Sequence, residues 1–344
     1  MRDSSLPTRS IHSSKEGIAL QTHSSATLSA QETRNLGGLI FDVQGFSVHD
    51  GPGCRTLIFM KGCPLTCKWC CNPEGQKPKP QMMYSQRRCR KETYSCIGAC
   101  PVGAISVNKI GDYPVFDRSK CATCDRFSCT KGCYNGAVRV VGRYVTVQEL
   151  MDTVRRDRAY WGSGGGVTLG GGEPLAQPEF TLTLLKELHD AYVHTAMETC
   201  ANVPWTRLEK AMQYSDWIFV DIKHMDPEKH KQETGVSNKL ILTNIERMAA
   251  LERSARIIVR MPVVPSFNDS DENVCAMAQF LRKIGRREVN LLPFHRLGTS
   301  KYEQLGMDYV YKDTQAPSVE KMNQIKKLFE QKGISCYLGS DTPF

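Results

Sequence analysis

Three closely spaced cysteines provide the most reactive group of side chains in this chain. Cys63, Cys67 and Cys70 lie in the run Lys61-Gly-Cys-Pro-Leu-Thr-Cys-Lys-Trp-Cys70, with three and then two residues between them. Three thiolates can bind only three irons of a 4Fe–4S cube, whereas an ordinary ferredoxin binds all four irons through cysteine. The spacing therefore predicts a cluster with one open iron, where a substrate can bind and react.

A structural zinc knuckle is the alternative interpretation of this loop. Structural zinc takes four ligands, usually from paired arms of two cysteines each. Cys71 is a spare thiol next to the third cysteine, but adjacent residues rarely bind one tetrahedral ion together. The pattern therefore favours the iron–sulfur interpretation.

A second motif follows about one hundred residues later in Thr168-Leu-Gly-Gly-Gly-Glu-Pro174. Glycines allow a backbone to approach a ligand without obstruction by Cβ atoms. The cysteine spacing resembles that of the radical S-adenosylmethionine (SAM) superfamily, and Gly171, Gly172 and Glu173 resemble its Gly-Gly-Glu motif. The resemblance implies that SAM binds the open iron through its amino and carboxylate groups. It also implies that the motif hydrogen-bonds the amino group, and that reduction yields a 5′-deoxyadenosyl radical.

Length and composition are typical of a reduced intracellular enzyme. A chain of 344 residues can form one large domain with an insert. Most of its fifteen cysteines stand at ligand spacing and no apolar signal region precedes them, so we expect a cytoplasmic protein. No apolar run is long enough to predict a membrane span. The formal charge of +9 comes without an aromatic stacking platform, so nucleic-acid binding is not predicted. We expect a monomer.

The distribution of residue types predicts three regions. Residues 1–37 are rich in Ser, Thr and Gln and predict a disordered extension. Residues 84–141 shift to cysteine, glycine and short turns, which indicates an inserted module. Residues 38–83 and 142–344 alternate strands with amphipathic helices, as in a right-handed parallel α/β sheet. About six strand–helix units are too few for a closed eight-stranded barrel, so we predict a partial (β/α)6 barrel.

Polar residues stand at or near the predicted ends of successive strands, where barrel enzymes place their active sites. These residues are Glu198, Thr199, Asp221, Lys223, Arg260 and His295. Helix capping is the alternative role for Thr199 and Asp221. An ion pair at the edge of the core is an equal alternative to a SAM contact for Arg260. Lys223 and His295 would both point a donor toward the same cavity.

Taken together, these segments resemble one branch of the superfamily, the activating enzymes of glycyl radical enzymes. The resemblance covers residues 38–344 and depends most on Ser47-Val-His-Asp-Gly-Pro-Gly-Cys-Arg55 and Trp69-Cys-Cys-Asn-Pro-Glu74. It implies SAM contacts at Trp69, Cys71, Gly172, Asp221, Lys223 and His295. It also implies a monovalent-cation site at Glu198, Thr199 and Asp221. Asp50 lies where the family contacts the glycine-bearing loop of its protein substrate.

The insert resembles a two-cluster bacterial ferredoxin, in which the last cysteine of each run binds the other cluster. Cys121, Cys124 and Cys129 with Cys100 would then complete one 4Fe–4S site. Cys89 and Cys96 with Cys133 would leave the other site with three thiolates. Thr93 stands roughly where a fourth cysteine is expected, so that cluster is either incomplete or has another ligand. A zinc-binding insert is the alternative. Cys54, Cys200, Cys275 and Cys336 are predicted to be small apolar residues.

The resemblance also implies a partner. The radical would remove hydrogen from one glycine Cα of a glycyl radical enzyme. The insert would pass electrons inward from reduced ferredoxin or flavodoxin, or would serve in docking. The segments 41–50, 291–298 and 342–344 most resemble activators of 4-hydroxyphenylacetate decarboxylase, and those of benzylsuccinate synthase are the alternative. A plain electron-transfer protein, or a radical SAM enzyme acting on a small molecule or ribosomal peptide, are rival classes.

Overall fold

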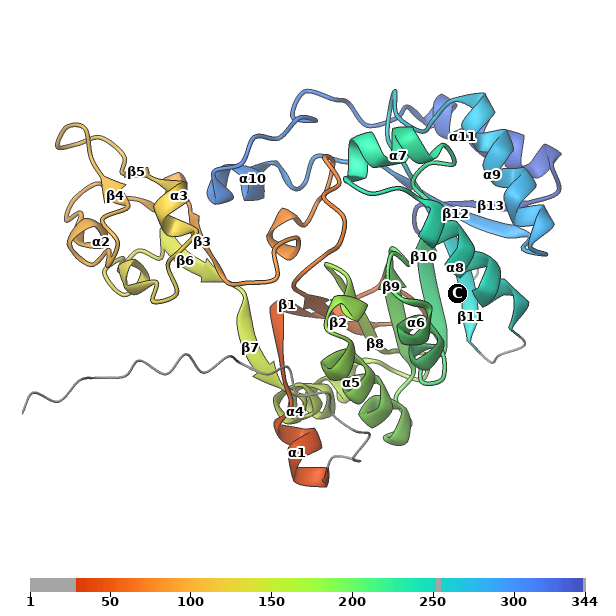
Figure 1. Cartoon of the computed structure of the whole chain (residues 1–344), viewed down its shortest axis with the longest axis horizontal. Helices are drawn as coiled ribbons and strands as arrows, with labels where there is room; N and C mark the ends of the chain where they lie inside the picture. The colour runs from red at the N-terminus through yellow and green to blue at the C-terminus, as the bar shows by residue number, and fades with distance from the viewer. Residues whose placement is uncertain (1–28, 252–254, 343–344) are drawn as a thin grey trace, which may run out of the picture.

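The computed structural model describes residues 29–251 and 255–342, and its centre is an open nine-stranded sheet (Figure 1). The strand order is β13-β12-β11-β10-β9-β8-β2-β1-β7. Neighbouring strands from β2 to β13 are parallel, whereas β1 is antiparallel to both β2 and β7. The strands are β1 (Gly37–Ser47), β2 (Arg55–Met60), β7 (Arg143–Thr146), β8 (Gly166–Gly171), β9 (Thr195–Thr199), β10 (Trp217–Asp221), β11 (Arg256–Val263), β12 (Glu288–Pro293) and β13 (Ser335–Leu338). The predicted partial barrel with a parallel sheet is confirmed.

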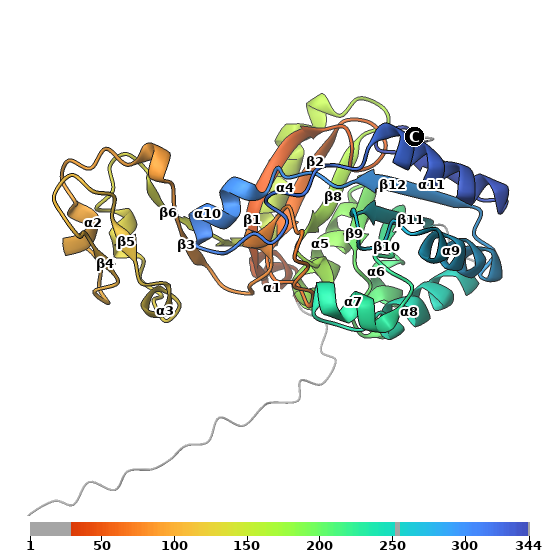
Figure 2. The same ribbon diagram turned by 90° about the horizontal axis from the view of Figure 1, so that it is seen from above.

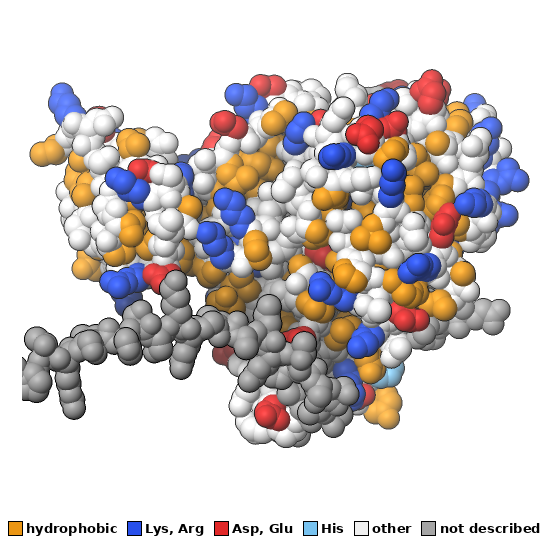
Figure 3. Space-filling model, viewed as in Figure 1, with side chains coloured by type: hydrophobic (Ala, Val, Ile, Leu, Met, Phe, Trp, Pro, Cys, Tyr) orange, Lys and Arg blue, Asp and Glu red, His pale blue; other side chains and the backbone are white. Residues whose placement is uncertain are grey.

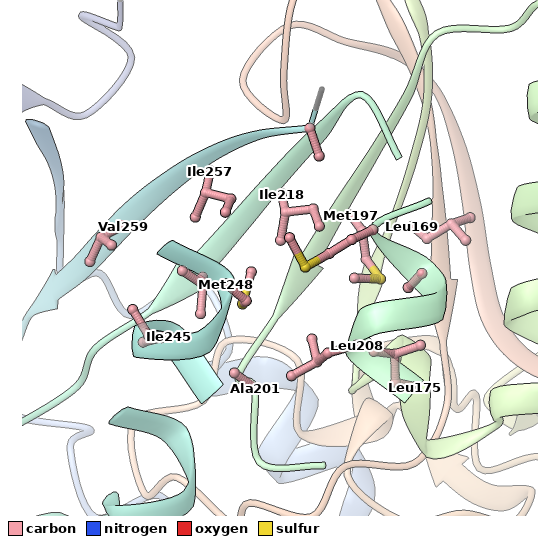
Figure 4. Packing of buried hydrophobic residues seen from close by; sticks show 14 of the residues in the cluster. Leu169, Leu175, Met197, Ala201, Leu208, Ile218, Ile245, Met248, Ile257 and Val259 are labelled. Carbon is pink, nitrogen blue, oxygen red and sulfur yellow. The ribbon is translucent and has the colours of Figure 1, made fainter. Parts of the chain in front are cut away.

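Helices cover one face of this sheet, and the main core lies between the two layers. The covering helices are α4 (Val147–Asp157), α5 (Pro178–Asp190), α6 (Trp205–Ala211), α8 (Lys239–Ala250), α9 (Asp271–Lys283) and α11 (Val319–Gln331). In Figure 4, Met197 and Ile218 of the sheet lie close to Leu208 and Met248 of the helices, and all four are buried. Because side chains alternate along a strand, the residues between these positions face the opposite, concave side of the sheet. That concave face carries the candidate site.

Helix α4 begins with a capping box, as the sequence Thr146-Val-Gln-Glu149 predicts. The Thr146 hydroxyl accepts a hydrogen bond from Glu149 N at 3.2 Å, and the Glu149 carboxylate accepts one from Thr146 N at 2.6 Å. The same threonine also ends β7, a strand that the sequence analysis did not predict. Strand β7 is specified by its pairing with β1 and has little local signal of its own.

The predicted disordered extension is wrong at its end. Residues 30–35 form helix α1 (Ala30–Asn35), with a capping box between Ser29 and Glu32. A capping box satisfies two free amide groups of the first turn and can fix a short helix in a polar segment. The remainder of that prediction, residues 1–28, lies outside the described residues, as do the last two residues of the closing segment 342–344.

Two further short helices were also missed, α7 (Pro227–Thr234) and α10 (Thr299–Leu305). Both are too short to show a clear apolar period. Helix α10 is important for the arrangement because it lies between the barrel and the insert (Figures 1 and 2). Single-turn 3-10 helices occur at Pro73–Gly75, Gln86–Arg88, Ser128–Thr130, Arg158–Tyr160 and Pro174–Ala176.

The insert is a separate lobe on a two-stranded stem (Figure 2). Strands β3 (Gln81–Tyr84) and β6 (Val138–Val141) pair antiparallel, so the insert begins slightly before the predicted boundary at residue 84. Beyond the stem lie α2 (Ser95–Gly98), β4 (Ile105–Ser106), β5 (Val115–Phe116) and α3 (Arg118–Cys121). Arg118 of α3 donates to Gln304 O of α10 at 3.0 Å, which ties the lobe to the barrel.

On the face shown in Figure 3, Lys and Arg side chains are dispersed over both lobes and do not gather in one patch. Among the described residues, no helix combines the length and the apolar character that crossing a membrane requires.

Candidate active site

The three cysteines lie on the loop of residues 61–76, called here the cluster loop, which leaves the end of β2. Backbone hydrogen bonds close this loop on itself, from Gly62 N to Gly75 O at 2.7 Å and from Cys63 N to Gln76 O at 2.9 Å. The ammonium group of Lys61 is completely buried inside it and donates to Glu74 O and, at 2.8 Å, to Gln81 Oε1. The loop therefore has a fixed shape, which its own backbone and the buried Lys61 side chain support.

The three thiols of the cluster loop are close enough to act on one another electrostatically. All three are free. Burial raises the pKa of Cys67 to about 12 and that of Cys70 well above its usual value, and neighbouring thiols add to both effects. In residues 29–251 and 255–342, no three His, Cys, Asp or Glu side chains meet at a point where they could share one ion. A cube binds each thiolate to a different iron, so this soft donor set fits a 4Fe–4S cluster.

The Gly-Gly-Glu motif places the end of β8 directly on the cluster loop. Gly172 N donates to Met60 O at 2.8 Å, and Glu173 N donates to Gly62 O at 2.7 Å. A Cβ atom on Gly172 would lie 2.3 Å from Gly62 O, and Gly171 has a φ of +95°. Only glycine allows both contacts, so the motif joins the two segments that the sequence analysis singled out.

The side chain of Glu173 makes contacts within the protein that the sequence did not predict. Its carboxylate is fully buried and accepts hydrogen bonds from Thr199 Oγ1 at 2.9 Å, Cys200 N at 2.8 Å and Leu175 N at 3.1 Å. Burial raises the pKa of Glu173. The carboxylate therefore joins β8 to β9 and is enclosed by protein donors.

A chain of alternating charges crosses the concave face of the sheet. Arg260 Nη1 lies 2.6 Å from Glu198 Oε1, Arg260 Nε lies 3.2 Å from Asp221 Oδ1, and Lys223 Nζ lies 2.8 Å from Asp221 Oδ2. Strand register causes this convergence, since Asp221 of β10 stands directly opposite Arg260 of β11. The Arg260 guanidinium also lies over the Phe219 ring, 5.0 Å from its centroid.

These charges change the pKa values of the residues that carry them. Burial raises the pKa of Glu198, although Arg260 opposes the effect. Burial acts in the same direction on Asp221, but the positive charges of Lys223 and Arg260 prevail and hold the pKa of Asp221 below its ordinary value. The Lys223 charge also acts on Cys67 and lowers the pKa of that thiol, against the larger effect of burial. Lys223 therefore lies between the carboxylates and the cluster loop.

Three predicted contact residues do not join this network. The Thr199 hydroxyl faces Glu173. The Trp69 indole is buried, with ring centroids 4.9 Å from Phe267 and 6.3 Å from Tyr311. His295 is exposed, and its hydrogen bond within the described residues is from Leu297 N at 3.4 Å. Their predicted contacts with SAM or a cation stay predictions.

The loop that carries Asp50 is fixed from beneath by buried polar groups. Thr168 Oγ1 donates to Asp50 O at 2.7 Å, and Ser47 Oγ donates to the Asp50 carboxylate. Arg55 is completely buried and donates to Thr168 Oγ1 at 2.8 Å and to Pro52 O at 2.9 Å. The charge of Asp50 contributes to the raised pKa of Glu198, so the loop lies near the concave face.

Sequence reasoning missed several residues that shape the site. Arg55 and Lys61 are the charged ends of an apolar strand segment, a pattern that could have marked them as buried anchors. Cys200 was predicted to be a small apolar residue, but its thiol forms a hydrogen bond with Cys63. This bond lowers the pKa of the Cys63 thiol. A Cβ atom on Gly298 would lie 3.0 Å from Cys71 Cα, so this glycine allows the loop after β12 to contact the cluster loop. Cys336 lies in the apolar core, as predicted.

Comparison with known proteins agrees with this geometry. Residues 49–97 match the 4Fe-4S single cluster domain, and residues 124–278 match the Radical SAM superfamily. The chain is 46% identical over 313 residues to the 4-hydroxyphenylacetate decarboxylase activating enzyme of Clostridioides difficile, covering 90% of this chain and 99% of the relative. The chain belongs to the radical SAM activating enzymes of glycyl radical enzymes. It therefore uses SAM, a 4Fe–4S cluster and a glycyl radical enzyme as its protein substrate.

Other members are similarly close to this activating enzyme. The indoleacetate decarboxylase activating enzyme of Tractidigestivibacter scatoligenes is 39% identical, covering 89% of this chain and 99% of the relative. The isethionate sulfite-lyase activating enzyme of Oleidesulfovibrio alaskensis is 40% identical, covering 85% and 93%. A solved domain of pyruvate-formate lyase-activating enzyme from Bacteroides vulgatus is 30% identical with a TM-score of 0.44, covering 51% of this chain and 99% of the domain.

The insert of this activating enzyme brings its cysteines together in the two sets that the ferredoxin pattern predicts. Burial raises the pKa of Cys129 to about 11, and the thiols of Cys100, Cys121 and Cys124 add to the effect, which places the four close together. In the same way, Cys133 and Cys89 act on Cys96. The last cysteine of each run therefore does lie with the other run.

Proposed function

We propose that this activating enzyme generates the glycyl radical of an arylacetate decarboxylase, with 4-hydroxyphenylacetate decarboxylase as its first partner. The supporting observation is the 46% identity to an activator of that decarboxylase, which extends over 99% of the relative. The activator of indoleacetate decarboxylase, which is 39% identical, supports the same class of partner. We further infer that the enzyme works as a cytoplasmic monomer supplied by reduced ferredoxin or flavodoxin.

The cofactor site is assigned to the cluster loop and the strand ends around it. A 4Fe–4S cluster held by Cys63, Cys67 and Cys70 supplies the electron for SAM cleavage. The backbone of Gly171 and Gly172 would contribute to the SAM site, because both residues pack against strand β2 and the cluster loop. Trp69 would contribute through its backbone, since its indole is already enclosed by aromatic neighbours.

The charged network is assigned to holding SAM in position. Asp221 and Lys223 present opposite charges beside the thiols, which suits a ligand that carries both an ammonium and a carboxylate group. Arg260 keeps Glu198 and Asp221 paired and rigid in the free enzyme. The carboxylates of Glu198 and Asp221 are already paired with Arg260. A monovalent cation at Glu198, Thr199 and Asp221 would therefore have to share them with Arg260. Exclusion of water from this buried face protects a primary radical.

The test is radical transfer to a purified partner. With SAM, a reductant and 4-hydroxyphenylacetate decarboxylase, we expect a doublet electron paramagnetic resonance (EPR) signal located on the decarboxylase. Deuteration of its glycine Cα should collapse the doublet to a singlet, because the unpaired electron couples to one remaining α-hydrogen. The same assay is run in parallel with benzylsuccinate synthase, the alternative partner. Signals on benzylsuccinate synthase alone, or brisk turnover of a small molecule with no partner signal, would contradict the proposal.

Asp50 provides a second test that separates partner contact from SAM chemistry. Asp50→Ala should weaken radical transfer much more than uncoupled SAM cleavage, since the Asp50 loop is fixed beside the concave face and not to the cluster loop. Asp42→Ala, an exposed aspartate on the neighbouring strand β1, is the matched control and should change neither rate. Equal losses of transfer and cleavage in Asp50→Ala would place Asp50 at SAM instead.

A further inference from the structure

The two thiol sets of the insert differ in what surrounds them. Cys100, Cys121, Cys124 and Cys129 border a cavity of about 10 Å³, whose other lining residues are apolar: Met82, Pro101, Val102, Ile105 and Phe127. The set of Cys89, Cys96 and Cys133 borders a cavity of about 190 Å³ that is lined by polar residues as well. The set with fewer thiols therefore has more room and more polar neighbours.

Sequence spacing points to one polar residue in the larger cavity. Cys89 and Glu92 are separated by two residues, as are Cys121 and Cys124 in the complete set. Glu92 thus stands where the complete set has its second thiolate, one position before Thr93. It lines the cavity, and its carboxylate makes no hydrogen bond or ion pair with any other described residue. The other residues that line this cavity include no aspartate or glutamate, so Glu92 is its one carboxylate.

A buried hydroxyl lies beside one thiol of this set. The Tyr84 hydroxyl, on strand β3 of the stem, is buried and has no nitrogen or oxygen partner among the described residues. It lies against the Cys89 thiol. Buried polar groups in folded proteins almost always have a partner. The Cys89 sulfur, once it is a thiolate bound to a cluster, would accept this hydrogen bond.

We propose that Cys89, Cys96, Cys133 and Glu92 hold a second 4Fe–4S cluster in the insert, with the Glu92 carboxylate on its fourth iron. A carboxylate is a harder ligand than a thiolate and suits this iron less well. The fourth iron is therefore the labile one. One-electron oxidation of this cluster releases that iron as Fe²⁺ and leaves three Fe³⁺ with four sulfides. The set of Cys100, Cys121, Cys124 and Cys129 has four thiolates and keeps its iron under the same treatment.

The test uses the full chain with Cys63, Cys67 and Cys70 all changed to Ala, because the cluster of the barrel also has an open iron. After anaerobic reconstitution this protein should contain about eight irons per chain. Mild ferricyanide oxidation should release about one iron per chain and produce the EPR signal of an oxidised three-iron cluster. Neither readout depends on SAM or on the partner, so failure here is separate from failure of the proposed function.

Two variants at Glu92 and one at its neighbour make the assignment specific. In the same background, Glu92→Cys should abolish both the iron release and the three-iron signal, because it completes a four-thiolate set. Glu92→Gln should already contain about seven irons per chain before any oxidant is added, and ferricyanide should then produce the three-iron signal without releasing further iron. Thr93→Cys, the matched control, should stay as sensitive to oxidation as its parent. The reduced EPR signal of the complete set reports that each variant has folded.

Three outcomes would overturn the assignment. The first is about four irons per chain in the parent protein, alone or with zinc. The second is an oxidation behaviour of Glu92→Gln identical to that of the parent. The third is protection by Thr93→Cys and not by Glu92→Cys, which would place the fourth ligand at position 93.

Discussion

The barrel site and the insert both gather cysteines, but they hold them in different ways. In the barrel, the thiols lie on a loop fixed by backbone hydrogen bonds, by a glycine contact with β8 and by a buried lysine. In the insert, they lie on and around α2 and α3, which have four residues each, and on turns over a small core. The sheet therefore shapes its site without any cofactor. In the insert, few structural contacts besides metal ligation would hold the cysteines in place. Metal binding and folding should be coupled much more strongly in the insert.

The largest expected effect separates the two regions by chemistry. Changing Cys67 to Ala should abolish SAM cleavage under any reductant, because it removes a ligand from the cluster with the open iron. The double variant Cys121→Ala, Cys124→Ala should lose the iron of that set and slow reduction by ferredoxin, yet still cleave SAM with a strong chemical reductant. The measurement is 5′-deoxyadenosine formed per chain. Undiminished SAM cleavage by an Ala variant of Cys63, Cys67 or Cys70 would contradict the site assignment.

Removal of iron should separate the regions by stability. After anaerobic chelation, amide hydrogen exchange in residues 85–137 should rise toward the rate of an unfolded chain. The core strands β8 to β11 should stay protected, because their protection derives from buried apolar contacts. Hydrogen exchange with mass spectrometry measures both. Uniform loss of protection in the two regions would show that the barrel depends on its cluster as well.

The charged network provides a test within the barrel. Arg260→Met leaves Glu198 and Asp221 without their shared cation, and removing one partner of a buried ion pair costs about 3–5 kcal/mol. Arg256→Met, on the same strand, breaks a more exposed pair with Glu288 and should cost about 0–1 kcal/mol for that pair. Urea unfolding of the two variants measures the difference. Similar losses would mean that the network contributes no more than a surface pair.

The smallest expected effect concerns the glycine contact. Gly172→Ala places a methyl group against Gly62 O and should cost about 1–3 kcal/mol through overpacking. It should also weaken SAM binding, because the strand end must move away from the cluster loop. Gly164→Ala, at an exposed glycine with no atom near its added methyl, is the control. Equal SAM affinity in both variants would remove the motif from the binding site.

Local patterns predicted those parts of the fold whose signals are contained in short segments. Alternating strands and amphipathic helices indicated the open parallel sheet, and the residues around Thr146 indicated the start of α4. Short, polar α1, α7 and α10 were missed because their formation depends on capping and on tertiary contacts. Strand β7 was missed because it exists through its pairing with β1.

Within the sites, the sequence predicted which cysteines group together but not which donors surround Glu173. The spacing of Cys100, Cys121, Cys124 and Cys129 predicted their grouping correctly, since a ferredoxin pattern fixes which run contributes to which site. For Glu173, the same kind of reasoning found the motif but not the role of the side chain. The three donors that enclose its carboxylate come from residues 175, 199 and 200, and their convergence depends on how β9 lies beside β8.

The sequence by itself determined the donor chemistry of this activating enzyme, because the number and spacing of thiols decide how many irons cysteine can bind. It also determined the class of fold, because the alternation of strands and helices is a local property. Only the tertiary structure decided which charges meet on the concave face. Arg260 reaches Glu198 and Asp221 across two neighbouring strands, and only the register of the sheet places the three on one face. Contacts between distant segments depend on packing, and no spacing within one segment can specify them.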